Sequence, residues 1–321
     1  MNSTICRFCG YSTLKKLFDT VDMYGDPYEI TLCLQCKAQQ LMPFPDQTKL
    51  DRAYQDSYYG GNETKFLIFI ENMINIIRKR RAKSVAKYLS SGANILDIGC
   101  GSGKFLSAIA SYGDFNIYGT EINGKAAQRS EQNSLIQLNT APLSMEQYPD
   151  ASFDLITLIH VFEHLDNPDF MLHFFNKKIK PGGILILSMP NPESLQARLF
   201  KSRWFHLDPP RHLLLYPEKT IIAALEQRKF KLESKRYLSL EQNPFSWVQS
   251  ILNCMSKKRE MLFESFKGNN NYYHKSAKLT MLLHQIFFFC TIPLFTIVEL
   301  FESAFHVSAT YKLVFKKVDH D

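Results

Sequence analysis

From residue 94 onward, short runs of consecutive apolar residues alternate with longer stretches whose apolar positions recur every three or four residues. The short runs span residues 94–98, 115–118, 135–138, 153–159, 183–188 and 231–238. Strands that are apolar throughout are buried on both faces. The alternation therefore predicts an α/β fold with a doubly wound, mostly parallel sheet that helices cover on both sides.

The part of the chain before this sheet carries one helical pattern and one small module. Residues 64–90 have apolar positions at spacings of three and four, which predicts an amphipathic helix. Ahead of it, Pro43 and Pro45 mark a turn that closes an N-terminal module near residue 50.

A long insertion of about seventy residues separates the run at 231–238 from a last predicted strand at 311–315. Its first part, residues 244–255, is amphipathic at helical spacing and precedes the basic triplet 257–259. The stretch 279–301 is uncharged for twenty residues before Glu299, which by length alone makes it a membrane-span candidate.

The return of the chain to the same sheet argues against a single membrane span here, because both ends of the apolar stretch then lie on one side. Pro293 stands near its middle, so we expect two shorter helices in a hairpin. Such a hairpin would dip into one leaflet of a membrane, form a buried dimer interface, or cover an acceptor pocket. The sequence leaves these three alternatives open.

Composition narrows the class of protein. The 321 residues are 45% hydrophobic and 21% charged, which excludes a disordered chain and a disulfide-stapled miniprotein. The net charge of +7 suits an anionic cofactor, an acidic substrate or a membrane surface. The aromatic content is 13%, with 25 Phe, and many of these lie in the late insertion. The N-terminus lacks the basic and apolar regions of a signal peptide, so we expect a cytoplasmic protein with reduced cysteines.

Four of the seven cysteines form two C-x2-C pairs, Cys6 with Cys9 and Cys33 with Cys36. Two such pairs in a reducing compartment predict a structural Zn²⁺ site with four thiolate ligands. The residues between the pairs do not form a basic surface, so we expect no nucleic-acid partner.

A glycine-rich loop, Asp97-Ile98-Gly99-Cys100-Gly101-Ser102-Gly103, follows the first predicted strand and precedes a helix. Glycines at these places let the backbone turn tightly and approach a ligand closely. The acidic Glu121 ends the next strand, where a carboxylate can accept both hydroxyls of a ribose.

This order of strand, D-x-G-x-G-x-G loop, helix, strand and terminal Glu resembles the class I S-adenosylmethionine-dependent methyltransferases. The likeness continues through the segments 152–165 and 180–192 and covers roughly residues 50–240 and 310–318. It implies a Rossmann-like, seven-stranded sheet that binds S-adenosyl-L-methionine. The cysteine module resembles zinc-binding N-terminal modules of certain bacterial methyltransferases, including deoxysugar C-methyltransferases.

The resemblance also implies roles for individual residues. The glycine loop (Asp97, Gly99, Gly101 and Gly103) would take the methionine part of the cofactor, and Glu121 its ribose. Residues 140–143 and His160 would enclose the adenine and methionine. A tyrosine near 58–59 would line the cofactor pocket or only pack beside it.

Two histidine segments should follow strand C-termini, where open α/β sheets hold their sites. The first is His160-x-x-Glu163-His164, which resembles the E-x-x-E-H cluster of ubiquinone-type O-methyltransferases, although His160 replaces the leading acid. The second contains His212, which falls where sugar C-methyltransferases place a base. Arg211 beside it would bind an anionic group of the acceptor or brace the loop with a salt bridge. We expect the catalytic residues to be His212, His164 and Glu163.

These features together predict a methyltransferase that acts on a sugar or lipid-linked glycan in cell-envelope biosynthesis. The alternatives are O-methylation of a quinone-like lipid precursor and a nonenzymatic, cofactor-binding assembly protein. We expect a zinc-ribbon-like module at 1–50, the cofactor-binding core at 51–240, a helical apolar insertion at 241–308, and the last strand with a tail at 309–321. Peripheral contact with the inner face of the cytoplasmic membrane and a homodimer are further expectations.

Overall fold

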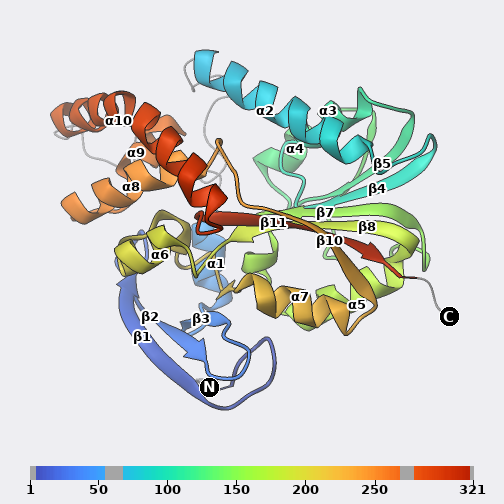
Figure 1. The fold of residues 1–321 in the computed structure, drawn as a ribbon, viewed down its shortest axis with the longest axis horizontal. Helices are drawn as coiled ribbons and strands as arrows, with labels where there is room; N and C mark the ends of the chain where they lie inside the picture. Colours follow the sequence, from blue (N-terminus) through green and yellow to red (C-terminus); the bar gives the residue numbers. More distant parts are fainter. Residues whose placement is uncertain (1–4, 55–67, 268–277, 319–321) are drawn as a thin grey trace.

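The computed structural model describes residues 5–54, 68–267 and 278–318 (Figure 1). Its centre is a seven-stranded sheet with the strand order β10-β11-β8-β7-β4-β5-β6. The pairs among β8, β7, β4, β5 and β6 are parallel, whereas β11 is antiparallel to both of its neighbours. The strands are β4 (Ala93–Ile98), β5 (Phe115–Thr120), β6 (Ile136–Asn139), β7 (Phe153–Ile159), β8 (Ile179–Pro190), β10 (Phe230–Arg236) and β11 (Thr310–Lys317).

Helices cover both faces of this sheet, as the alternation of strand and helix patterns predicts (Figure 1). One face carries α2 (Ile68–Ala86), α3 (Lys104–Ala110) and α4 (Lys125–Glu131), and the other carries α5 (Pro168–Lys178) and α7 (Glu218–Glu226). The apolar strand residues divide between two buried clusters, one beneath each helical layer. The predicted doubly wound α/β fold is thereby confirmed.

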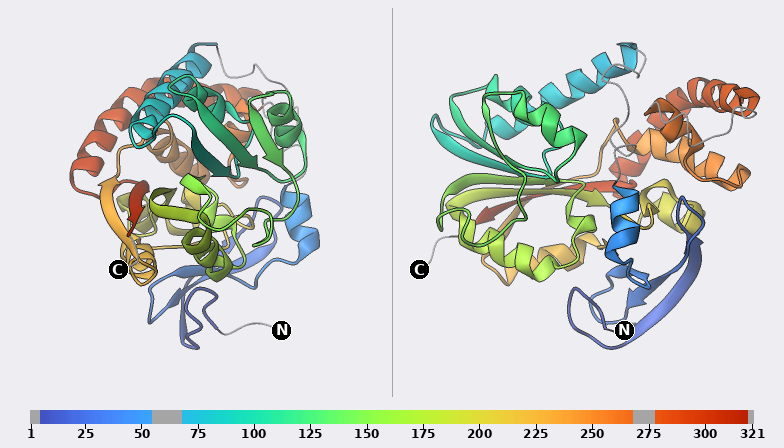
Figure 2. Two further views of the ribbon diagram at one scale, coloured as in Figure 1. Left: turned by 90° about the vertical axis from the view of Figure 1, so that its right-hand side faces the viewer. Right: turned by 180° about the vertical axis from the view of Figure 1, so that it is seen from behind.

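The N-terminal module is a separate, four-stranded antiparallel sheet with the order β1-β2-β3-β9, followed along the chain by α1 (Gln47–Ala53). Its own strands are β1 (Leu14–Val21), β2 (Pro27–Cys33) and β3 (Gln39–Met42). The fourth strand, β9 (Leu214–Leu215), comes from the segment that follows His212. The module therefore packs beside the core and pairs with it in one sheet (Figure 2).

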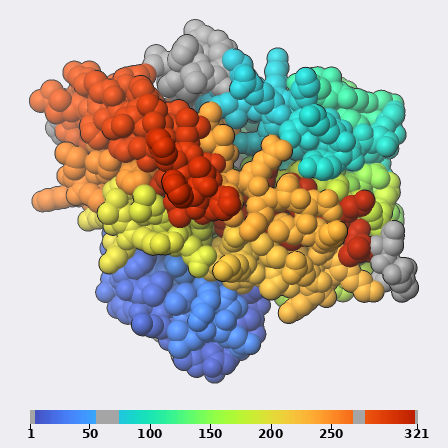
Figure 3. All heavy atoms as spheres, viewed as in Figure 1, coloured from blue at the N-terminus to red at the C-terminus, as the bar shows by residue number. Residues whose placement is uncertain are grey.

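Along the chain between β10 and β11, the described residues form the helices α8 (Asn243–Met255), α9 (Met261–Phe266) and α10 (Lys278–Ala304). They lie together at one end of the sheet, near α6 (Leu195–Phe200), as Figures 1 and 3 show.

The expected hairpin in the apolar stretch is wrong, because α10 is one continuous helix of 27 residues with Pro293 inside it. Packing on both sides of the proline accounts for this. Phe288 packs against Phe245 of α8, with ring centroids 5.9 Å apart, and Phe295 stacks on Trp247 of α8 at 5.4 Å. Proline removes one helical hydrogen bond, and the contacts to α8 on both sides of Pro293 keep the two halves in one continuous helix.

The last turns of α10 are anchored by buried carboxylates. Glu299 accepts hydrogen bonds from the Ser239 amide and the Asn243 side chain, and Glu302 accepts one from the Trp247 indole. Most of the remaining helix surface is apolar and exposed. Within the described parts of the chain, α10 is the one helix that by length and composition could cross a membrane.

A candidate active site at the carboxyl edge of the sheet

The glycine loop lies directly after β4, at the carboxyl edge of the parallel strands. Gly99, Gly101 and Gly103 all have positive φ angles, between 58° and 71°, which side-chain-bearing residues rarely adopt. A Cβ atom on Gly99 would lie 2.4 Å from the side chain of Val161, whereas one on Gly101 would meet open space. The loop therefore packs against the segment after β7 at Gly99 and stays open at Gly101.

Glu121, just after β5, lies beside this loop. Its carboxylate accepts hydrogen bonds from the backbone amides of Gly101, at 2.6 Å, and Ile122, at 2.9 Å. The side chain is only partly buried. An acidic residue in this place suits the hydroxyls of a bound ribose.

Asp97, the first residue of the glycine-loop motif, points inward. It is 4% exposed and accepts a hydrogen bond of 2.5 Å from the hydroxyl of Thr157 on β7. Burial raises its pKa to about 7. This contact ties β4 to β7 beneath the loop, and a direct contact of Asp97 with a cofactor stays a prediction.

The histidine segment that follows β7 packs against the glycine loop through Val161. His160 has a positive φ of 57°, and its Nδ1 lies 3.3 Å from the carboxylate of Glu163. Glu163 is completely buried, and its two oxygens have no geometrically defined hydrogen-bond partner among the described residues. A buried carboxylate of this kind requires compensating positive charge or a ligand.

The second histidine segment lies against the first. His212 Nδ1 lies 2.7 Å from the backbone oxygen of His206, so this nitrogen carries the proton in the neutral ring. Its Nε2 lies 3.9 Å from Glu163 and 3.9 Å from Asp208. The rings of His164 and His212 are edge to face at 4.6 Å. All three predicted catalytic residues thus lie together.

Burial and the neighbouring charges shift the pKa values of the residues in this cluster. Burial alone would raise the pKa of Glu163, but the contact with His160 at 3.3 Å and its charge, together with the charges of His212 and His164, lower this pKa to about 2. Burial and then the charge of His212 lower the pKa of His164 to about 4. Burial and then His160 lower that of His206 to about 3. Glu163 is therefore ionised at neutral pH, while His164 and His206 are neutral.

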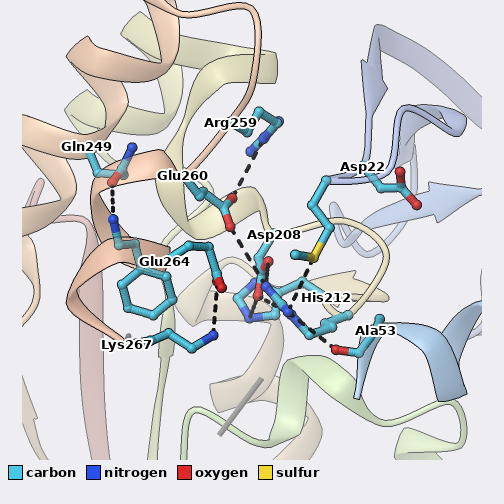
Figure 4. A network of polar contacts seen from close by, with 12 residues as sticks. Asp22, Ala53, Asp208, His212, Gln249, Arg259, Glu260, Glu264 and Lys267 are labelled. Atoms are coloured by element: carbon cyan, nitrogen blue, oxygen red, sulfur yellow. Dashed lines mark hydrogen bonds and ion pairs between the residues drawn. The ribbon is translucent and has the colours of Figure 1, made fainter. Parts of the chain in front are cut away.

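Arg211 braces the loop that carries His212. It is 2% exposed, and its guanidinium donates to both oxygens of Asp208 and to the backbone oxygen of Ala53. Glu260 lies 3.8 Å from it on the other side, in the network that Figure 4 shows. These contacts favour the salt-bridge alternative over the binding of an acceptor anion.

The sequence did not indicate that Tyr54 belongs to the site. Tyr54 Oη lies 2.9 Å from His164 Nδ1, which the backbone oxygen of Arg211 also approaches at 3.0 Å. The tyrosines expected near the cofactor, Tyr58 and Tyr59, lie outside the described residues. A count of aromatic residues after the cysteine module would have included Tyr54 but could not distinguish it.

A cavity of about 620 Å³ opens beside the histidine cluster. His160, His164 and His212 line one end of it, and side chains of α8, α9 and α10 line the other. The late insertion therefore covers a pocket next to the candidate catalytic residues, as one of its three expected alternatives requires.

The four paired cysteines form a second cluster, in the N-terminal module. Cys6 and Cys36 have their sulfurs 3.6 Å apart, as do Cys9 and Cys33, and all four sulfurs lie within 4.8 Å of one another. Four converging sulfur atoms are the donor set that structural Zn²⁺ prefers. A further group, Glu163 with His164 and His212, has donor atoms within the same distance of one another.

Comparison with known proteins gives one family match. The model described as "Methyltransferase domain" matches residues 69–235, just over half of the chain. Ribosomal protein L11 methyltransferase of Shewanella halifaxensis is 31% identical over 126 residues, which cover 38% of this chain and 42% of that protein. The mitochondrial ubiquinone biosynthesis O-methyltransferase of Dictyostelium discoideum is 25% identical over 138 residues, which cover 38% of this chain and 43% of that protein. The chain thus spans less than half the length of these curated relatives.

Among solved structures, a putative sarcosine dimethylglycine methyltransferase from Galdieria sulphuraria superposes with a TM-score of 0.52 and 14% sequence identity. The superposition covers 84% of this chain and 99% of that one. At this identity the likeness supports the fold.

The lowered histidine pKa values predict a loss of stability in mild acid. The unfolded chain takes up protons on His164 and His206 near pH 6.5, while the folded chain resists until about pH 4 and 3. Stability from these groups is thus complete above pH 6.5 and falls as the pH drops. Between pH 7.5 and 5 the free energy of unfolding should fall by about 2 kcal/mol less in His206→Phe than in the wild type.

Urea unfolding at a series of pH values checks this. The exposed His173 provides a matched control, and His173→Phe should leave the pH dependence unchanged. Equal pH dependence in wild type and His206→Phe would contradict the prediction.

Proposed function

The chain belongs to the methyltransferase family whose domain model matches residues 69–235, and from that premise we propose that it transfers a methyl group from S-adenosyl-L-methionine to a sugar or lipid-linked acceptor in cell-envelope biosynthesis. The observation that carries the transfer chemistry is the contact between Gly99 and Val161. It brings the cofactor-type glycine loop and the histidine cluster to one edge of the sheet.

The cofactor would lie over the open side of the glycine loop. Gly101 and Gly103 would face its methionine part, Glu121 its ribose, and His160 with residues 140–143 would enclose the remainder. Bound there, S-adenosyl-L-methionine supplies an electrophilic methyl group on a sulfonium centre. The protein's main task is then to align an acceptor atom about 3 Å away.

His212 is the proposed general base. Because its Nδ1–H donates to the His206 carbonyl, the lone pair of Nε2 is available to remove a proton from the acceptor. Glu163 and Asp208, each 3.9 Å from that nitrogen, would stabilise the imidazolium that forms. His164 is held by Tyr54 and by the Arg211 carbonyl, and we assign it a positioning role beside His212.

The cysteine cluster would hold a structural Zn²⁺. Its four sulfur donors leave no open position for a reacting group, so its role is to hold the N-terminal module together. The divisions of the chain at residues 50, 240 and 308 are part of this proposal, as are a cytoplasmic location, peripheral membrane contact and a homodimer.

A second candidate function is O-methylation of a quinone-like lipid precursor. It is favoured by the donor group of Glu163, His164 and His212, whose composition suits a divalent cation. A nonenzymatic assembly role would leave the convergence of His212 with the carboxylates of Glu163 and Asp208 unexplained.

Cofactor binding tests the proposal first. Gly101→Arg should abolish the binding heat of S-adenosyl-L-methionine in calorimetry, because its side chain would enter the open space over the loop. Gly92→Arg is the matched control, since Gly92 also has a positive φ and open surroundings. Gly92 precedes β4, so the length of this strand places it roughly 20 Å from the glycine loop. Absence of binding heat in the wild type would contradict the proposal.

The role of His212 can be separated from a metal site by kinetics. With labelled cofactor and envelope extract as the acceptor source, His212→Gln should lower the transfer rate by about 10²–10⁴-fold and leave cofactor affinity unchanged. Added Mg²⁺ or Mn²⁺ should not change the wild-type rate. A rate that depends on the divalent cation would favour the quinone-type alternative.

Metal analysis tests the cysteine cluster. The purified chain should contain one Zn²⁺, and Cys33→Ser should lose it together with thermal stability. Cys254→Ser, at an exposed position outside the cluster, should keep the metal and the melting temperature of the wild type. Zinc-free wild-type protein of unchanged stability would contradict this assignment.

A further inference from the structure

The cavity beside the histidine cluster has an apolar half that methyl transfer itself does not require. Its lining continues from the histidines onto α8, α9 and α10, far beyond the reach of one reacting group. A volume of about 620 Å³ is that of a complete small-molecule site. The question is which kind of molecule such a lining accepts.

Aromatic rings line this half as a continuous series. Phe205, next to His206, lies 5.4 Å from Phe245, which lies 5.9 Å from Phe288. Phe288 in turn lies 5.1 Å from Phe289, which lines the cavity and is also 48% exposed. The series thus leads from the histidine end of the cavity to the molecular surface on α10.

The polar groups of this half are largely engaged already. The Thr296 hydroxyl donates within its own helix to the Ile292 carbonyl, and Glu241 pairs with Arg81 at 2.6 Å. Among the described residues that line the cavity, Gln242 Oε1 and His206 Nε2 are the exceptions, since each is buried without a hydrogen-bond partner. A sugar or a peptide backbone would leave many groups unsatisfied here, whereas a hydrocarbon chain would not.

The outer side of α10 extends the same apolar character. Ile286, Leu294 and Phe301 are each at least half exposed on this helix, and Phe289 marks where the cavity meets it. Lipid surfaces receive helices of this kind. A chain that leaves the cavity past Phe289 would continue into an apolar environment.

We propose that the apolar half of the cavity binds the hydrocarbon chain of a lipid acceptor, with its polar head group at His212 and its tail leaving past Phe289 along α10. This inference rests on the proposed function in one respect: the head group of the lipid is taken to be the part that accepts the methyl group. It narrows the acceptor class from sugars in general to lipids.

A chain-length series tests it without knowledge of the head group. Binding of 1-hexanol, 1-octanol and 1-decanol to the full chain is measured by calorimetry without cofactor. Affinity should rise about fourfold for each added methylene, the equivalent of about 0.8 kcal/mol. Affinity that does not depend on chain length overturns the proposal.

Two substitutions locate the bound chain. Phe289→Asp should weaken 1-decanol binding at least tenfold, because it places a charge at the cavity mouth. Phe301→Asp makes the same change on the same helix outside the cavity lining and should leave binding unchanged. Thr296→Phe, which reduces the cavity, should weaken 1-decanol more than 1-hexanol.

The outcomes separate this inference from the proposed function. Equal weakening of 1-decanol binding by Phe289→Asp and Phe301→Asp would mean adsorption to the helix surface. A concentration-dependent dimer that hides Phe289 would mean a protein partner at this surface. Either result overturns the proposed site for the hydrocarbon chain. Gly101→Arg should lose the cofactor and keep 1-decanol binding. Wild type that binds 1-decanol but not the cofactor would refute the methyl transfer and leave the chain site standing.

Discussion

The completely buried carboxylate of Glu163 is the constraint on which the rest of the site depends. It stays ionised because His160 and His212 lie 3.3 Å and 3.9 Å from it. A buried charge is tolerated only where such partners surround it. The loops after β7 and before β9 therefore have to meet, since each contributes a histidine to the same carboxylate. Glu163 also accepts the Leu213 amide with its backbone oxygen, at 2.9 Å, which fixes the loops' register.

The N-terminal module stabilises the contact between these two loops. Leu213 accepts a hydrogen bond from the Leu41 amide, and β9 pairs with β3 directly beyond it. Thr220, at the start of α7, donates to the carbonyl of Cys36. The cysteine cluster is thus connected within a few residues to His212, so that a structural metal ion would stabilise the loop that carries His212 as well as its own module.

Much of the fold was predictable because burial on both faces leaves a clear apolar pattern in parallel strands, and the loop glycines are required by backbone angles that few other residues adopt. The sequence predicted that Glu163 and His212 each follow a strand end, but not the contact between them, because contacts between distant segments leave no periodic pattern. Tyr54 was missed for the same reason. The hairpin prediction failed because it considered only the local effect of Pro293, whereas packing of Phe288 and Phe295 on α8 keeps the helix continuous.

The place of the late insertion follows from the strand directions. β11 runs antiparallel to β8, with Thr310 opposite Pro190, so β11 begins at the edge where the parallel strands end. β10 runs antiparallel to β11, with Arg236 opposite Lys312, so it ends at that same edge. Any insertion between them must emerge beside the glycine loop and the histidines. The Phe-rich helices consequently lie on the side that we propose for the acceptor, and variation there would change the acceptor without disturbing the glycine loop.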